Sequence, residues 1–253
     1  MNKKKLIGMA VACVTLGVVL AAVAGGCPPN DDAGVVFADA SLEAVIRESI
    51  GIREGPIHAP NMRQLTMLDA YQKGISDLTG LEHATRVDML DLGANEISDI
   101  SPLANLTGLV DLNLGSNEIS NVSPLANLTS LIDLNLGDNQ IGDLSPLANL
   151  INLGVLDLRA NQISDVSPLA NLTNLRFLHL GDNQISDISP LANLTNLLLL
   201  RLGANQIDDI RPLVDNPGLG PGKIVDLRDN PLSEESINEH IPALQARGVT
   251  VEY

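Results

Sequence analysis

The sequence predicts an α/β solenoid, in which short coils stack and share one parallel sheet. Three observations lead to this fold class. Asparagines recur every 22 residues, and the residues around each asparagine repeat with it. Trp is absent and there are only two Phe and two Tyr, yet 45% of the residues are hydrophobic. A compact globule of this size normally fills its core with some aromatic side chains, whereas many identical aliphatic layers would not need them.

The repeat unit contains a short strand. In the copy that begins at Leu109, the alternation Leu112-x-Leu114 predicts a strand whose leucines point inward. Complete copies begin at Val87, Leu109, Leu131, Leu153 and Leu175, with an incomplete one at Leu197 and a degraded one at Leu65; a terminal copy contains Val225, Leu227 and Asn230. One unit cannot bury its own apolar side, so stacking is expected to form a continuous core and a parallel sheet on the concave face.

The recurring asparagine lies where the chain leaves each strand. The series consists of Asn95, Asn117, Asn139, Asn161, Asn183 and Asn205. Burying an amide costs free energy unless it is hydrogen-bonded, so these side chains are expected to form a ladder that bonds neighbouring backbones. We therefore interpret the asparagines as structural rather than as ligand-binding residues.

The return side of each coil carries Ser-Pro-Leu, at 101–103, 123–125, 145–147, 167–169 and 189–191. Ser is a good N-cap and Pro is tolerated at the first helical position, which predicts a short helical or 3₁₀ turn on the convex side. Asn-Leu-Thr recurs at 105, 127, 171 and 193 and matches the glycosylation sequon. Because it sits in the repeat frame, we interpret it as part of the repeat.

The frame Asn-x-Ile-Ser-Asp-Ile-Ser-Pro-Leu-Ala-Asn-Leu-Thr resembles the internalin-like leucine-rich repeats of bacterial surface proteins over about residues 65–240. The resemblance implies a leucine-rich-repeat solenoid and a role in protein binding or adhesion. It stops at the repeats, because no cell-wall sorting signal or Ig-like domain is visible after them. Host invasion is therefore not implied.

A helical cap is predicted before the repeats. Residues 40–50 place apolar side chains on one face, with Asp39 as the N-cap and Gly51 as the stop. A cap is needed because the open end of an apolar stack would aggregate.

A helix and a strand are predicted to cap the other end. Ser233 can cap a helical stretch that runs to about Arg247, and Pro242 should kink or split it. Residues 249–253 are expected to form the final edge strand.

The N-terminus has the pattern of a secretory signal. Lys3 to Lys5 precede an apolar run from Leu6 to Ala24, and Ala24-Gly25-Gly26-Cys27 ends that run. These small residues before Cys27 resemble a bacterial lipobox, which implies cleavage before Cys27 and a lipid on its sulfur. Two alternatives remain open: the apolar run is long enough to span a membrane, and the segment could be cleaved without lipid attachment.

The domain organisation expected from these patterns has five parts. They are a signal peptide at 1–26, a lipidated Cys and acidic spacer at 27–34, a helical cap at 35–64, leucine-rich repeats at 65–221, and a terminal repeat with the C-terminal cap at 222–253.

Charge and cysteine content restrict the partners. Removing 1–26 takes away three lysines and no acidic residue, so the net charge falls from −16 to −19. Such a surface repels phosphate backbones, and nucleic-acid binding is not expected. Any membrane contact is expected through the N-terminal lipid.

Cys13 lies in the apolar run, so the shortened chain keeps only Cys27 and cannot form an internal disulfide.

Reading the variable strand positions in register predicts a binding patch on the concave face. Val155, Phe177 and Leu199 should lie side by side, because adjacent coils are about 4.8 Å apart. They are bordered by basic side chains, Arg159, Arg176, His179 and Arg201. An aromatic residue ringed by Arg is typical of interface hot spots, so these seven residues are the candidate ligand-binding site. The alternative explanation is that these residues reflect neutral sequence variation at surface positions that no function constrains.

The remaining acidic and histidine residues do not predict a catalytic or metal site. The acidic cluster on the early coils (Asp88, Asp91, Asp111, Asp133 and Asp138) shows no calcium-loop spacing. His179 should lie beside Asp157, but no Ser occupies the adjacent positions. We expect no catalytic residue, no metal and no cofactor.

The sequence therefore predicts a non-catalytic, monomeric leucine-rich-repeat protein that is exported and anchored in a bacterial cell envelope, either periplasmic or surface-exposed. It is expected to bind a protein or a glycan on its concave face. The alternative is a structural or self-associating envelope spacer.

Overall fold

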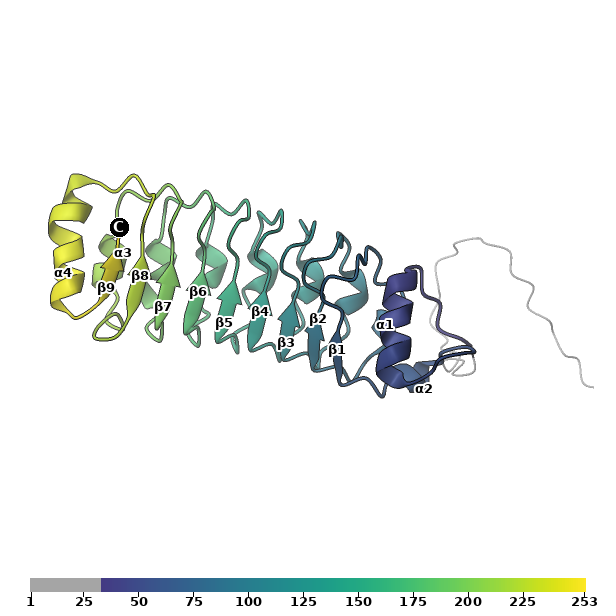
Figure 1. The fold of residues 1–253 in the computed structure, drawn as a ribbon. Coiled ribbons are helices and arrows are strands. Elements are labelled where there is room, and N and C mark those ends of the chain that lie inside the picture. The colour runs from purple at the N-terminus through teal and green to yellow at the C-terminus, as the bar shows by residue number, and fades with distance from the viewer. Residues whose placement is uncertain (1–32) are drawn as a thin grey trace, which may run out of the picture. The chain divides into compact units, whose positions relative to one another are not determined.

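The structure is a computed structural model that describes residues 33–253. These residues form one parallel sheet of nine strands, which follow one another in chain order from β1 to β9 (Figure 1). The strands are β1 (Met67–Asp69), β2 (Met89–Asp91), β3 (Asp111–Asn113), β4 (Asp133–Asn135), β5 (Val155–Asp157), β6 (Phe177–His179), β7 (Leu199–Arg201), β8 (Ile224–Asp226) and β9 (Thr250–Glu252). The predicted leucine-rich-repeat solenoid is thus confirmed.

The register between strands follows the sequence repeat without slippage. Leu112 of β3 pairs with Leu90 on one side and Leu134 on the other, and all three side chains are buried. Because strand side chains alternate between faces, the residues on either side of each central leucine point away from the core. The buried side chains form one continuous aliphatic cluster from Leu42 in the N-terminal cap to Val249 before β9.

The repeated asparagines form the predicted ladder. Asn139 donates hydrogen bonds to the carbonyls of Leu136 at 3.1 Å and of Leu114, one coil earlier, at 3.0 Å. Its side-chain oxygen accepts from the N–H of Ile119 at 2.9 Å. Asn95, Asn117, Asn161, Asn183, Asn205 and Asn230 make the same kinds of bond. Each amide therefore ties its own coil to the preceding one.

The convex side returns through short 3₁₀ turns, as predicted. They are η1 (Leu81–His83), η2 (Ser101–Leu103), η3 (Ser123–Leu125), η4 (Ser145–Leu147), η5 (Ser167–Leu169) and η6 (Ser189–Asn193).

The expected Ser N-cap is wrong. Ser101 is the first residue of η2, and its hydroxyl donates to Asp99 instead of accepting from the helix. The N–H of Ser101 also donates to Asp99, at 2.8 Å. A carboxylate two residues earlier is a stronger acceptor than a hydroxyl and closes a local turn. Asp143 and Asp165 hold Ser145 and Ser167 in the same way.

The N-terminal cap contains α1 (Ala40–Ile50) and α2 (Ala59–Met62). Asp39 is the N-cap of α1 and accepts from the N–H groups of Ser41 and Leu42 at 2.8 and 3.0 Å. Gly51 ends the helix in the left-handed conformation, with φ of 72°. Both predicted end signals are confirmed, and α1 lies at the β1 end of the sheet (Figure 1).

The last coil before the C-terminal cap departs from the repeat. It returns through α3 (Arg211–Asp215), after which Asn216 takes the position that holds Leu in the complete copies. Asn216 is fully buried, and its amide donates to the carbonyls of Leu191 and Leu194 at 3.3 and 3.2 Å. The guanidinium of Arg247 donates to the carbonyls of Val214 and Asn216, which joins this coil to the cap.

The C-terminal cap combines η7 (Ser236–His240), α4 (Ile241–Ala246) and β9. The hydroxyl of Ser233 accepts from the N–H of Ser236 at 3.1 Å, as expected of the N-cap. Pro242 lies in the first turn of α4 and cannot donate a backbone hydrogen bond, and the helix changes there from a wide π turn to an α-helix. The helical run continues through Pro242 without a break, so the predicted split is wrong, whereas the predicted final strand is confirmed.

No helix within residues 33–253 has the length and apolar character needed to cross a membrane. The predicted signal peptide at 1–26 and the predicted lipid site at Cys27 lie outside the described residues, as does most of the 27–34 spacer.

Candidate functional site

The apolar centre of the candidate site lies on three adjacent strands. Val155, Phe177 and Leu199 pair in register on β5, β6 and β7 and face away from the core. Phe177 is 40% exposed, although it is a large apolar side chain. The row continues to Ile224 on β8, which is also exposed. Ile224 was not among the seven residues of the predicted patch.

A small hollow of about 160 Å³ lies over this row. It is lined by Val155, Leu156, Asp157, Phe177, Leu178, His179, Leu199 and Arg201. Five of the seven predicted site residues therefore share one surface depression. The other two, Arg159 and Arg176, are exposed and do not line it.

Arg176 faces a second hollow, of about 370 Å³, on the N-terminal side of the strands. That hollow is also lined by Asn174, Asn196 and Lys223. Two cations therefore gather at this edge in a chain whose net charge is −16. The repeat frame predicted the position of Arg176 on the concave face. It did not predict that Lys223 lies near Arg176, because the coil that leads to β8 is longer than the other coils.

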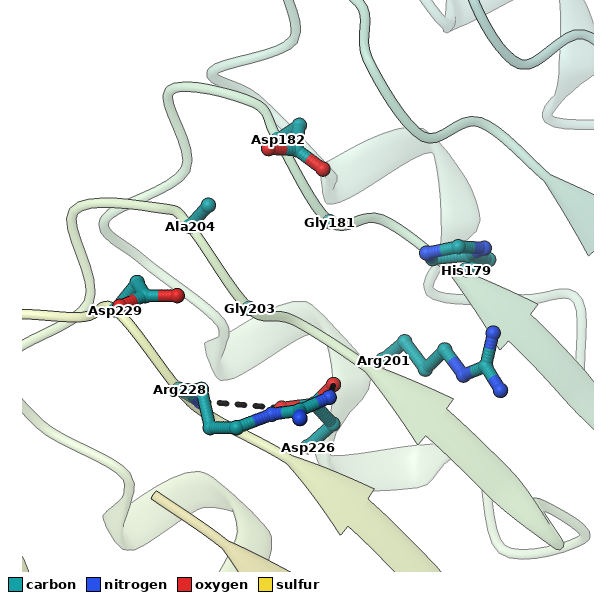
Figure 2. A pocket seen from close by; sticks show the side chains of 9 residues that line it. All are labelled: His179, Gly181, Asp182, Arg201, Gly203, Ala204, Asp226, Arg228 and Asp229. Carbon is teal, nitrogen blue, oxygen red and sulfur yellow. Dashed lines mark hydrogen bonds and ion pairs between the residues drawn. The ribbon is translucent and has the colours of Figure 1, made fainter.

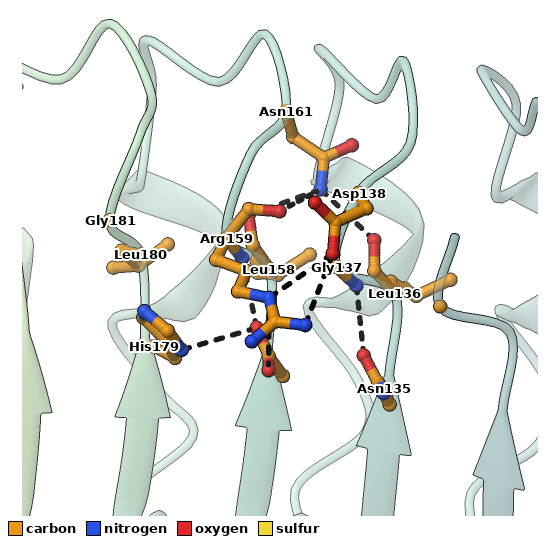
Figure 3. Close-up of polar contacts among 12 residues, drawn as sticks. Asn135, Leu136, Gly137, Asp138, Leu158, Arg159, Asn161, His179, Leu180 and Gly181 are labelled. Atoms are coloured by element: carbon orange, nitrogen blue, oxygen red, sulfur yellow. Dashed lines mark hydrogen bonds and ion pairs between the residues drawn. The ribbon is translucent and has the colours of Figure 1, made fainter. Parts of the chain in front are cut away.

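Arg159 is held by acidic neighbours. Its guanidinium donates to Asp138 of the preceding coil at 3.1–3.2 Å (Figure 3) and lies 4.0 Å from Asp157. Both partners are acceptors, so Arg159 is positioned rather than free to turn toward Phe177. It forms the boundary between the acidic coils and the apolar row.

Asp157 and His179 lie side by side on β5 and β6, as the register predicted. The Nδ1 atom of His179 is 3.5 Å from Oδ1 of Asp157. Partial burial by itself would raise the pKa of Asp157, but the His179 side chain and the backbone N–H of Arg159 outweigh it and hold the pKa below its ordinary value. The register partner of His179 on its other side is Arg201, so the two strand neighbours of His179 are Asp157 and Arg201 and neither is Ser, Thr or Cys.

Asp111 and Asp133 are opposite each other on β3 and β4. Burial raises the pKa of Asp133, and the nearby charges of Asp111 and Asp157 raise it further. Within residues 33–253, no three His, Cys, Asp or Glu side chains are grouped so that they could hold a metal ion. Asp91 is instead engaged as an acceptor from Asn113.

A second apolar area on the first coils was missed by sequence reasoning. Met67 and Met89 pair in register on β1 and β2 and line a hollow of about 230 Å³. Met67, Tyr71 and Met89 are all exposed. The signal was present in the degraded copy that begins at Leu65, since Met67 occupies the same frame position as Phe177.

Another hollow near the candidate site lies after β6, β7 and β8 and has a volume of about 390 Å³ (Figure 2). It is polar and is lined by His179, Gly181, Asp182, Arg201, Gly203, Ala204, Asp226, Arg228 and Asp229. His179 and Arg201 line both this hollow and the one over Phe177. An apolar surface and a polar surface thus meet at these two side chains.

Comparison with known families gives three consecutive matches. The model described as "Leucine Rich repeats (2 copies)" matches residues 85–127, 129–171 and 173–215. No curated protein matches the sequence.

Solved structures provide further similarities. The chain is similar to internalin C2 (inlC2) of Listeria monocytogenes, with 36% identity and a TM-score of 0.76 over 85% of this chain and 94% of that one. It is also similar to an internalin (inlF) of the same organism, with 35% identity and a TM-score of 0.79 over 85% of this chain. The chain spans 62% of the length of that second structure.

A more distant structure shares the fold alone. The LRR ectodomain of the plant receptor kinase GASSHO1/SCHENGEN3 of Arabidopsis thaliana, solved with CASPARIAN STRIP INTEGRITY FACTOR 2, is 23% identical with a TM-score of 0.63. The match covers 76% of this chain and 24% of the ectodomain.

Proposed function

This chain belongs to the leucine-rich-repeat family, in its internalin-like form, and from that premise we propose that it binds a protein partner on its concave face. The contact centre is Phe177, flanked by Val155 and Leu199. Arg201, His179, Arg159 and Arg176 surround this centre, and Ile224 extends it.

We further propose that Cys27 carries a lipid that anchors the protein in the cell envelope, after removal of residues 1–26, with residues 27–34 as the spacer.

The observation that carries the proposal is the exposure of an aromatic ring inside a hollow of its own. Phe177 is 40% exposed, although each of its register neighbours is also apolar. Exposed apolar patches on soluble domains are most often contact sites. Large aromatics and Arg provide most of the binding free energy in measured interfaces. A concave sheet is also the surface that repeat proteins usually present to partners.

A protein partner fits this surface better than a glycan does. The hollow over Phe177 is bordered by the apolar side chains of Val155, Phe177 and Leu199, which face away from the core. Burial of such side chains is favourable in proportion to the apolar area removed from water. A partner that inserts an aliphatic or aromatic side chain would gain this free energy, whereas a sugar would present mostly hydroxyl groups. A glycan ligand therefore remains the lesser alternative.

Site-specific photo-crosslinking tests the proposal. A photoreactive phenylalanine analogue replaces Phe177 in the full chain, in the cells that produce it. The matched control places the same analogue at Ile151, which is 53% exposed and lies on the return segment after η4 rather than on the sheet. We expect a discrete crosslinked product with another protein from position 177 and none of the same mass from position 151.

Two other results would contradict the proposal. Identical products from both positions would mean that collisions, rather than the patch, produce the crosslinks. A product with twice the mass of the chain itself would instead support the alternative of a self-associating envelope protein.

A further inference from the structure

A second ladder runs along the end of the sheet, separate from that of the repeated asparagines. The last residue of a strand accepts, through its side chain, a hydrogen bond from the N–H two residues later. Asp91 accepts from Gly93 at 2.9 Å, and Asn113 accepts from Gly115 at 3.0 Å. The same bond joins Asp69 to Tyr71, Asn135 to Gly137, Asp157 to Arg159 and Asp226 to Arg228.

Two neighbouring coils lack this bond. Their strands end at His179 and Arg201, which replace the Asp or Asn of the other coils. The N–H groups of Gly181 and Gly203 have no hydrogen-bond acceptor within the part of the chain that the structure describes. Gly181 is buried and Gly203 is half-buried, so neither N–H is fully hydrated. A partly buried N–H group without an acceptor destabilises the fold, so a ligand that accepts from it is favoured.

The polar hollow of about 390 Å³ lies over these two glycines. Both glycines line it, and neither has a side chain that would cover its own N–H. A Cβ at Gly137, whose N–H is already bonded, would meet the side chains of Arg159 and Asp157 at 3.0 and 3.1 Å. The nearest side chains are slightly farther away at the other two glycines: His179 at 3.3 Å for Gly181 and Asp226 at 3.5 Å for Gly203. The missing acceptors and the open space therefore coincide, although they are independent observations.

The charges in the hollow favour a group that carries one negative charge. Arg228 is already engaged, 2.6 Å from Asp226 and 3.3 Å from Glu252. The guanidinium of Arg201 makes no hydrogen bond or ion pair within residues 33–253, although its charge helps to lower the pKa of Asp226, its register partner on β8. It is therefore available to an incoming anion. Asp182 and Asp229 lie at the other end of the hollow, away from Arg201 (Figure 2). They would repel a doubly charged anion such as phosphate more strongly than a carboxylate.

We propose that this hollow binds the carboxylate of an acidic side chain on the protein partner, which supplies the acceptor that His179 and Arg201 do not. One carboxylate oxygen would accept from the N–H of Gly203, as Asp or Asn oxygens do in the other coils. The other oxygen would pair with Arg201, and Gly181 would provide a further donor. Charge-assisted bonds of this kind are about twice as strong as neutral ones.

The site deepens the proposed function, because His179 and Arg201 join it to the hollow over Phe177. A partner whose apolar side chain contacts Phe177 would therefore place an acidic residue nearby over Gly203. The test below uses acetate, which needs no partner. Its failure would leave the Phe177 proposal standing, and failure of the Phe177 crosslink would leave the carboxylate site standing.

The experiment is an amide NMR titration of the ¹⁵N-labelled full chain with sodium acetate, with sodium chloride at equal ionic strength as the reference. We expect the amide signals of Gly181 and Gly203 to shift saturably with acetate. Those of Gly115 and Gly137 should stay in place, because Asn113 and Asn135 already accept their hydrogen bonds. Neutral acetamide and inorganic phosphate should both bind at least about fivefold more weakly than acetate.

Two variants complete the test. Arg201→Asn removes the cation and installs the acceptor present in the coils of Asn113 and Asn135, so acetate should bind at least tenfold more weakly at Gly203. Ile151→Ala changes an exposed side chain outside the hollow and should leave the acetate response unchanged. The proposal is overturned if chloride shifts Gly203 as much as acetate does, if phosphate binds more tightly than acetate, or if Arg201→Asn keeps the full response.

Discussion

The side-chain amide of Asn161 donates a hydrogen bond to the carbonyl of Leu136, one coil earlier in the chain, at 3.0 Å. The same amide bonds two carbonyls of its own coil, and its oxygen accepts from the N–H of Ile141 at 2.9 Å. Asn161 is only 9% exposed. Four hydrogen bonds in two coils therefore depend on a single buried side chain.

Replacing Asn161 with Ala should lower the free energy of unfolding by about 2–4 kcal/mol, because each lost bond contributes about 1 kcal/mol and buried backbone groups are left unpaired. Chemical denaturation followed by circular dichroism measures this change. Asn174→Ala is the matched control, since exposed Asn174 makes one bond, to the carbonyl of Ile151. Equal losses in the two variants would show that the ladder does not carry the stability assigned to it.

Arg228→Gln should destabilise the C-terminal end at neutral pH, because it removes the guanidinium that pairs with buried Asp226 at 2.6 Å. The Arg228 side chain is the main cause that lowers the pKa of Asp226. A lowered carboxyl pKa contributes stability that is present above its unfolded value, 3.8, and is lost as pH falls through the folded value.

The difference between this variant and the natural chain should therefore shrink as pH falls below about 4. Unfolding free energies measured across that range test it. Arg211→Gln serves as the control, because Arg211 and Asp215 form a highly exposed pair 3.9 Å apart that is worth less than about 0.5 kcal/mol. A difference that stays constant with pH would rule out the ion pair as its origin.

Asp133→Asn should raise stability at pH 7 by about 0.2–1 kcal/mol, the usual magnitude for cross-strand pairs. Burial and the like charges of Asp111 and Asp157 raise the pKa of Asp133. For an acid with a raised pKa, the folded state binds protons more tightly, so the natural chain loses stability as pH rises through this window. The advantage of the variant should accordingly disappear at acidic pH.

Thermal unfolding at pH 7 and pH 3.5 checks this prediction, with Glu118→Gln on an exposed turn as the control. A gain that is the same at both pH values would point to a packing effect of the amide rather than to relief of charge repulsion.

Most of the fold could be predicted from the sequence, because a strict repeat fixes the register residue by residue. The pairing of Asp157 with His179 followed from counting 22 positions between them. The caps at Asp39, Gly51 and Ser233 followed from local end signals. The role of Ser101 did not, because a Ser near a turn can donate or accept, and only the structure shows that Asp99 is the acceptor.

The candidate site was predictable only in part. Columns of side chains can be read from the repeat, so the neighbours of Phe177 were identified. Side-chain direction cannot be read in that way, and Arg176 proved to line a separate hollow with Lys223. The unpaired N–H groups of Gly181 and Gly203 required the complete set of hydrogen bonds.

The lipid anchor is testable without a partner. Intact mass of the protein extracted from membranes should correspond to residues 27–253 with an acylated Cys27. Cys27→Ser should remove the acyl mass and release the protein from the membrane fraction. Residues 1–26 retained in the natural chain, or an unmodified Cys27, would contradict the prediction.

The central claim is that the concave patch around Phe177 is where a protein partner binds. Its most direct test is the Kd for the partner captured at position 177, measured by calorimetry for the natural chain, Phe177→Ala and Ile151→Ala. We predict that Phe177→Ala weakens binding at least about tenfold, since truncating a hot-spot aromatic costs about 2 kcal/mol or more. Ile151→Ala should stay within twofold of the natural chain. A Phe177→Ala variant that binds as tightly as the natural chain would contradict the account.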